Sequence, residues 1–268
     1  MKNNIVYGAI MPHPPILVPF IGRDNINAAK KSQSSLIGVA KKLKKISHGL
    51  DAIVLISPHG SVAQSTVPVY TAEEYFGSFH QFGFPEPEFR AAGDPEFSKE
   101  LVKEAGNLAS ATDITTLDHG MLVPLYYPLE EKVELPIVPI AIGFLGLNEL
   151  FNFGKKIQIT ANRLNKKVAV IASADMSHKL IPTAPSGYDP AGQEFDNKLV
   201  ELVRNYDING ILNFDPLLAD RAGQDALWSI AILLGALDQL PIKHNVLSYE
   251  GPFGVGYMVA DFEVENGK

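Results

Sequence analysis

The sequence contains no cysteine among its 268 residues. Disulfides, thiolate nucleophiles and thiolate metal sites are therefore excluded, and any metal must be held by nitrogen and oxygen ligands. Long apolar runs are also lacking, because the longest, Leu227 to Leu237, is shorter than the ~18 residues that a membrane-spanning helix needs. The N-terminal apolar run is short and broken by Pro12 and Pro14. We therefore expect no signal peptide, no membrane partner and a cytoplasmic location.

Positive charge is scarce as well. The net charge of −7 argues against nucleic acid as a partner. The one basic cluster, Lys41 to Lys45, alternates with apolar residues at helical spacing and is interpreted as a solvated helix face. The chain also lacks a Gly-x-Ser-x-Gly elbow, a P-loop and a Gly-x-Gly-x-x-Gly fingerprint where its first strand meets a helix. An activated-serine hydrolase and a nucleotide-binding protein are therefore poorly supported.

Continuous β-branched runs alternate with helical patterns along the chain. Strands are expected at Ile5–Ile10, Asp51–Ser57, Val67–Thr71, Leu135–Ile142, Val168–Ala174, Asn245–Glu250 and Gly256–Val264. Helices are expected at Asn25–Ser47, Asp94–Leu108, Leu147–Leu164, Pro190–Tyr206 and Gln224–Gln239. This alternation predicts an α/β fold: a single domain over residues 1–268, with a mostly parallel, mixed sheet flanked by helices on both faces. The short Gly251–Val255 turn predicts that an antiparallel hairpin completes the sheet.

The least regular segment is Glu73–Gly93, which combines five phenylalanines with several glycines and prolines. A loop this aromatic is expected to be more than a solvated connection. It is interpreted either as a lid over a pocket or as a subunit contact.

Four of the seven histidines follow apolar, strand-like runs and lie in small-residue or proline turns: His13, His59, His119 and His178. Side chains that leave neighbouring parallel strands converge at one edge of the sheet, and imidazole is the commonest metal ligand. His13 lies between two prolines, which hold its backbone in an extended turn. The sequence therefore predicts a metal site with acid/base groups beside it, and isolated surface-turn histidines are the alternative.

His119 follows Asp118, and His178 comes three residues after Asp175. A carboxylate near an imidazole is typical of a residue that orients a metal ligand, but it also suits a buried structural histidine. The remaining histidines, His48, His80 and His244, have weaker contexts and are interpreted as structural or peripheral, with His80 the strongest exception.

A carboxylate follows the apolar strand expected near the C-terminus. Glu250 precedes a turn of glycine and proline, and a carboxylate in such a place is costly unless it is paired or bound to a cation. With His13 and His59 it would complete two histidines and one carboxylate, the set that leaves open positions on Fe(II).

Taken together, these motifs resemble the class III extradiol ring-cleavage dioxygenases, the family of the protocatechuate 4,5-dioxygenase catalytic subunit. The resemblance spans almost the whole chain through Pro12-His13-Pro14-Pro15, Ser57-Pro58-His59-Gly60, Leu117-Asp118-His119-Gly120, Ser177-His178 and Glu250. Each motif is weak alone, whereas five in the right order are fairly specific. The chain also resembles the Memo group, which shares the fold.

The resemblance implies that His13, His59 and Glu250 bind Fe(II), that His178 is the acid/base residue and that His119 is a second pocket histidine. It implies a non-haem dioxygenase that cleaves a catechol-like small aromatic with O₂. The main alternative is a Memo-like metal-binding regulatory protein without turnover. Another is a zinc- or manganese-dependent hydrolase with the same ligands. A homo-oligomer, most simply a dimer, is expected from base rates.

Overall fold

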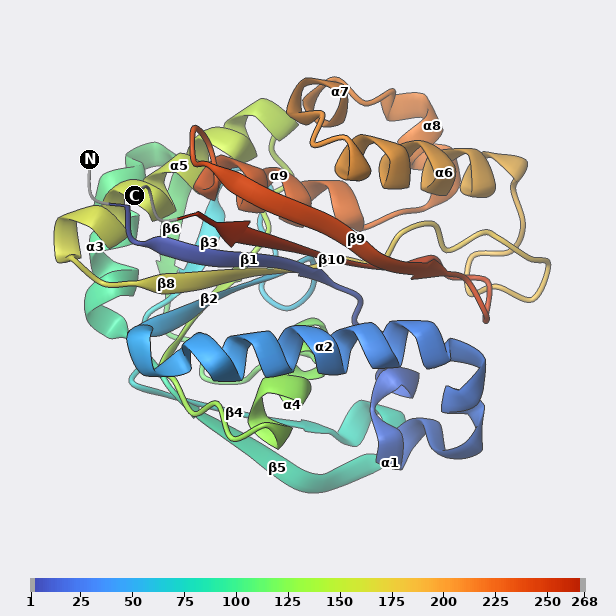
Figure 1. Ribbon diagram of the computed structural model, residues 1–268, viewed down its shortest axis with the longest axis horizontal. Helices are drawn as coiled ribbons and strands as arrows, with labels where there is room; N and C mark the ends of the chain where they lie inside the picture. Colours follow the sequence, from blue (N-terminus) through green and yellow to red (C-terminus); the bar gives the residue numbers. More distant parts are fainter. Residues whose placement is uncertain (1–2, 266–268) are drawn as a thin grey trace.

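The computed structural model describes residues 3–265 and is built on a mixed sheet. Eight strands of the described residues form this sheet in the order β6-β3-β7-β2-β8-β1-β10-β9 (Figure 1). They are β1 (Ile5–Met11), β2 (Ala52–Ser57), β3 (Val67–Tyr70), β6 (Ala109–Thr112), β7 (Ile137–Ala141), β8 (Val168–Ser173), β9 (Ile242–Glu250) and β10 (Tyr257–Val264). The centre is parallel, and β10 and β9 close one side as the expected antiparallel hairpin.

The parallel strands β1, β8 and β2 lie side by side and are aligned by one cross-sheet row. Ile10 of β1 pairs with Ala172 of β8, which in turn pairs with Ile56 of β2. Nearly all residues of these strands are buried, as expected for strands covered on both faces. Their carboxyl ends therefore reach the same edge of the sheet at the same level.

Helices cover both faces of the sheet (Figure 1). They are α1 (Pro19–Gly22), α2 (Lys30–Ile46), α3 (Pro95–Ala105), α4 (His119–Glu130), α5 (Leu147–Leu164), α6 (Pro190–Arg204), α7 (Ile208–Leu212), α8 (Pro216–Ala222) and α9 (Ala226–Ala236), with short 3-10 turns between some of them. One hydrophobic core lies under α3, α5, α6 and α9, and the other lies under α2 and α4. Alternate residues of each central strand enter the two cores, because successive side chains of a strand point to opposite faces.

The predicted α/β class with a mostly parallel, mixed sheet is confirmed, and α5 has the expected bounds. The assignment of residues 1–268 to one domain stays a prediction. Among the described residues, no helix is both long enough and apolar enough to cross a membrane.

Several segments differ from expectation, among them β6, α1, α7 and α8, which were not expected. Glu73–Gly93 is not irregular, because it forms the antiparallel pair β4 (Glu74–Phe79) and β5 (Phe84–Ala92). Helix α4 was not expected, because Pro124 and Pro128 lie inside it and proline disfavours a helix interior. Its residues from Gly120 to Pro128 are buried, so packing against the sheet and α2 outweighs this local preference.

Helices α5 and α9 contact each other at glycines, so the contact is sensitive to any added side-chain atom. A Cβ added at Gly154 of α5 would lie 2.1 Å from the backbone oxygen of Ile232 in α9. We expect Gly154→Ala to lower the free energy of unfolding by about 1–3 kcal/mol, because the helices must separate. Urea titration followed by circular dichroism measures the change.

Gly38 of α2 provides the matched control, because a Cβ there meets no atom within 4 Å. Gly38→Ala should stabilise the protein by about 0.5–1 kcal/mol through helix propensity. Equal responses of the two variants would contradict the tight packing of α5 on α9.

Candidate metal centre

The cross-sheet row of Ile10, Ala172 and Ile56 also places three polar side chains. Three residues beyond each member of the row stand His13, Asp175 and His59. Because the three strands are parallel neighbours, these residues leave the sheet at the same edge and level. Asp175 therefore has the same place after its strand as His13 and His59 have after theirs.

His13 is held in place through its backbone N–H and through one nitrogen of its ring. Its backbone N–H donates to Asp175 Oδ1 at 2.9 Å, and its Nδ1 lies 2.8 Å from the hydroxyl of Ser173. The side chain is 1% exposed. With Nδ1 engaged, Nε2 remains available as a metal donor.

His59 is fixed by a chain of hydrogen bonds. Its backbone N–H donates to Ser57 Oγ at 3.1 Å, and that hydroxyl donates to Asp118 Oδ1 at 2.8 Å. Gly60 follows in the left-handed region (φ 79°), and a Cβ at this position would lie 2.6 Å from Asp118 Oδ2. Glycine at position 60 thus permits both the turn and the close approach of Asp118.

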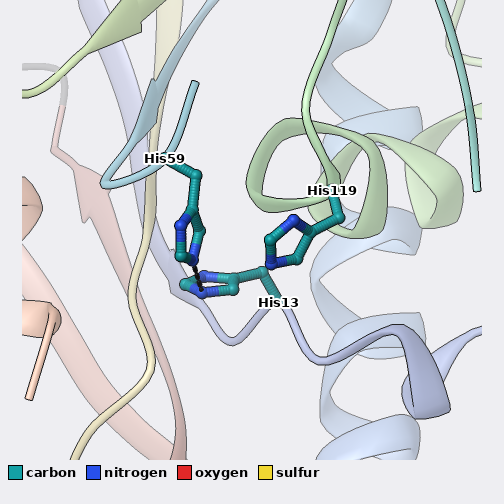
Figure 2. A group of neighbouring side chains, drawn as sticks. All are labelled: His13, His59 and His119. Carbon is teal, nitrogen blue, oxygen red and sulfur yellow. Dashed lines mark hydrogen bonds between the residues drawn. The ribbon is translucent and has the colours of Figure 1, made fainter. Parts of the chain in front are cut away.

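His119 is the first residue of α4, directly after the N-cap residue Asp118. Its ring lies 4.3 Å from that of His59 and 5.6 Å from that of His13, centroid to centroid. Figure 2 shows the three rings turned toward one another, each from a different segment. One ligand nitrogen from each lies within 4.8 Å of the other two, so the three histidines could hold a metal ion.

A carboxylate also faces this group. Asp225 Oδ2 lies 3.4 Å from His13 Nε2 and 3.5 Å from His59 Nε2, and the two Nε2 atoms are 3.0 Å apart. For metal–ligand bonds of about 2.1 Å, ligands at right angles lie about 3.0 Å apart and tetrahedral ligands about 3.4 Å apart. The three atoms therefore have the spacing of ligands around one divalent ion.

The orientation of Asp225 supports this role. It occupies the N-cap position of α9 but makes no capping hydrogen bond with its side chain. Its Oδ1 instead accepts the backbone N–H of Asp175 at 2.9 Å, which leaves Oδ2 directed at the histidines. A carboxylate turned away from the helix that it begins, toward two imidazole nitrogens, suits a cation site.

The carboxylates of Asp175 and Asp225 and the burial of the site change the pKa values of the histidines. Burial lowers the pKa of His13, but Asp175 and Asp225 outweigh this effect and raise it to about 9. Burial, together with charge on His13 and His59, lowers the pKa of His119 to about 3. Burial also raises the pKa of Asp175 to about 6, whereas His13 counteracts burial and holds the pKa of Asp225 below its usual value. The field that favours a proton on His13 equally favours a metal cation.

His178 lies beside the carboxylates, close enough for its charge to act on Asp175 and Asp225. Its backbone N–H donates to the carbonyl of Ala222 at 3.2 Å, and its Nδ1 donates to the carbonyl of Gly223 at 2.9 Å. A carbonyl can only accept, so Nδ1 carries a proton, and Nε2 is the ring nitrogen left to exchange a proton with another group.

Glu250 departs from the expected ligand set. The structure brings His13 and His59 together, but Glu250 Oε1 accepts from the backbone N–H and the hydroxyl of Ser32, at 2.7 and 2.8 Å. Ser32 lies in the first turn of α2, where backbone N–H groups lack helical partners and the helix dipole favours negative charge. Strand β9 is two strands from β1, a lateral distance of about 10 Å.

Two residues of the site were therefore missed. Asp175 was noted only as a partner of His178, although it has the same place after its strand as His13 and His59 have after theirs. Asp225 carries no strand-end signal, because it begins a helix. Among the described residues, His48, His80 and His244 are not part of the histidine cluster, and His244 Nε2 donates to the carbonyl of Arg204.

Comparison with known proteins gives consistent matches over most of the chain. Residues 7–260 match the family described as the catalytic LigB subunit of aromatic ring-opening dioxygenase. Protein CA_C1420 of Clostridium acetobutylicum is 32% identical over 95% of this chain, and the chain spans 56% of that protein's length. A MEMO1 family protein of Thermococcus onnurineus is 24% identical over 73% of this chain and 84% of its own.

A solved structure has the same fold. The crystal structure of uncharacterized protein JW3007 from Escherichia coli K12 aligns with a TM-score of 0.63 over 96% of this chain and 99% of its own. The sequence identity is 17%, so this likeness extends to the fold alone.

The two carboxylates can be separated by metal titration. We expect Asp225→Asn to weaken Co(II) binding at least about 100-fold, because the charged ligand is lost, while Glu250→Gln leaves the affinity within about twofold. The visible spectrum of bound Co(II) and calorimetry both measure this.

Glu250→Gln has a separate expected effect on stability. Loss of its charge at the first turn of α2 should lower the free energy of unfolding by about 1 kcal/mol. Loss of Co(II) binding in Glu250→Gln but not in Asp225→Asn would reinstate Glu250 as the ligand.

Proposed function

This chain belongs to the family of the catalytic LigB subunit of aromatic ring-opening dioxygenases, and from that premise we propose that it is a non-haem, Fe(II)-dependent extradiol dioxygenase. Its substrate in this proposal is a small catechol-like aromatic, cleaved with O₂. The observation that carries the proposal is the convergence of His13 Nε2, His59 Nε2 and Asp225 Oδ2 within 3.5 Å of one another.

Two histidines and one carboxylate are the ligand set of non-haem Fe(II) oxygenases, which leaves coordination positions open. Fe(II) bound by these residues would offer positions for ring hydroxyls and O₂ and would lower the pKa of the coordinated hydroxyls. His119 would stand beside this group as a pocket histidine. Zinc and manganese are the alternative metals, and with them a hydrolytic function is the competing chemistry.

His178 would act as the proton carrier. Its Nδ1 is held by the Gly223 carbonyl, so its Nε2 is free to accept a proton from a substrate hydroxyl and later to return it. Because the backbone of His178 is also bonded to Ala222, the ring has a fixed origin and direction. A base held in this way removes a proton without a costly rearrangement.

His119 and the β4–β5 pair would shape the pocket. Burial keeps His119 neutral at pH 7, so its ring can contact an aromatic substrate or accept a hydrogen bond without adding charge. Phe82, at the turn between β4 and β5, packs edge-on against His119 with centroids 5.2 Å apart and is 41% exposed. This placement supports a role of the segment as a cover over the site.

A Memo-like metal-binding protein without turnover is the second candidate. Several relatives are named MEMO1 family proteins, and Glu250 binds Ser32 instead of joining the histidines. A homo-oligomer remains part of the proposal on base rates.

The two candidates differ in oxygen consumption. We propose anaerobic loading with Fe(II), followed by measurement of O₂ uptake and coloured ring-cleavage products with a panel of catechols. Uptake that requires both iron and a diol supports the dioxygenase. A filled iron site that consumes no O₂ with any diol favours the Memo-like function.

The role of His178 can be tested in the same assay. We expect His178→Ala to bind Fe(II) normally but to lower kcat by about 10²–10⁴-fold, the usual contribution of a positioned acid/base group. Asp225→Asn, which should lose iron, provides the contrast. Release of iron by His178→Ala would instead make His178 a ligand.

A further inference from the structure

A cavity lies on the other side of the turn that carries Asp225. It has a volume of about 260 Å³ and is lined by residues of α8, α9 and the start of α5. Its wall is mostly apolar and includes two aromatic rings: Leu147, Phe214, Pro216, Ala219, Leu227 and Trp228. Gly223, whose carbonyl accepts from His178 Nδ1, also lines it, but none of the side chains that would hold the metal does.

The cavity and the metal centre use different sides of the N-terminal turn of α9. Gln224, Leu227 and Trp228 have helical spacing and face the cavity, whereas Asp225 faces the histidines. Gln224 is held in place because its Oε1 accepts the backbone N–H of Leu227 at 2.8 Å. The cavity wall is thus built on the same anchored turn as the metal centre.

One charged residue lines the cavity, and a second charge lies close to it, because Lys198 Nζ is 4.8 Å from the centroid of the Phe214 ring. The lining residue is Asp220, which is exposed and forms no ion pair in the described chain, unlike its neighbour Arg221, which pairs with Asp189. An apolar wall with one free carboxylate suits a ligand that has an aromatic ring at one end and a positive charge at the other. The volume admits one ring with a short side chain.

We propose that this cavity is a binding site for a monocyclic aromatic amine in its protonated form. The ring would lie against Phe214 and Trp228, and the ammonium group would face Asp220. The proposed binding uses none of the side chains that would hold iron or move the proton, although Gly223 contributes to both sites.

The chain contains a reporter for this site. Trp228 is the single tryptophan of the sequence, and its ring packs edge-on against Phe144 at 5.6 Å, beside the cavity. We expect benzylamine to change the Trp228 emission saturably, with excitation where tyrosines and the probe do not absorb. Benzyl alcohol, of similar shape but uncharged, should bind roughly three- to fivefold more weakly, the contribution of an exposed ion pair.

Two variants test the assignment. Asp220→Asn should bring the affinity for benzylamine down to that for benzyl alcohol, and Asp24→Asn, the same charge change at a distant exposed site, should leave it unaltered. Ala219→Leu should fill the cavity and abolish both responses, while circular dichroism and Co(II) binding show that the fold and the metal centre are retained.

Emission that changes linearly with probe concentration, or equally in Ala219→Leu, would overturn the proposal. So would equal affinity of the two probes for the unmodified protein, because the carboxylate of Asp220 would then have no part in binding. Failure of the dioxygenase assay would leave these outcomes unaffected.

Discussion

The register of three parallel strands is the constraint on which the centre depends. Since Ile10, Ala172 and Ile56 form one row, the residues that follow them leave the sheet together. A slip of one residue would turn every side chain of a strand to the opposite face and would exchange the two hydrophobic cores. The burial of both faces therefore specifies the relative positions of His13 and His59 as firmly as it specifies the fold.

The same reasoning explains how much the sequence could predict. The buried parallel strands were identifiable from their β-branched runs, and the residues after them were identifiable as site candidates. Helix α4 was hidden by Pro124 and Pro128, and Asp225 was hidden because it begins a helix reached only after α6, α7 and α8. Its position depends on how one helical layer packs on the sheet, which local patterns do not encode.

Glu250 shows the limit of a strand-end argument. Its strand does run parallel to β1, since β9 and β1 both pair antiparallel with β10, so Glu250 reaches the expected edge of the sheet. The edge extends across all the strands, however, and only adjacent strands bring side chains together. The expected cost of an unpaired carboxylate there was sound, but a helix N-terminus at Ser32 offsets it in place of a metal.

The ligand residues come from different parts of the fold, so a bound metal ion would stabilise the structure in addition to supplying chemistry. His13 and His59 come from the rigid centre of the sheet, whereas Asp225 belongs to the turn between α8 and α9, and the carbonyl of Gly223 in this turn also holds His178. An ion shared by these donors would tie that turn to the sheet, so its binding free energy would also stabilise the docking of the helices. Ligand geometry and the direction of the base would then be set in one event, because the residues that determine them are two positions apart on one turn.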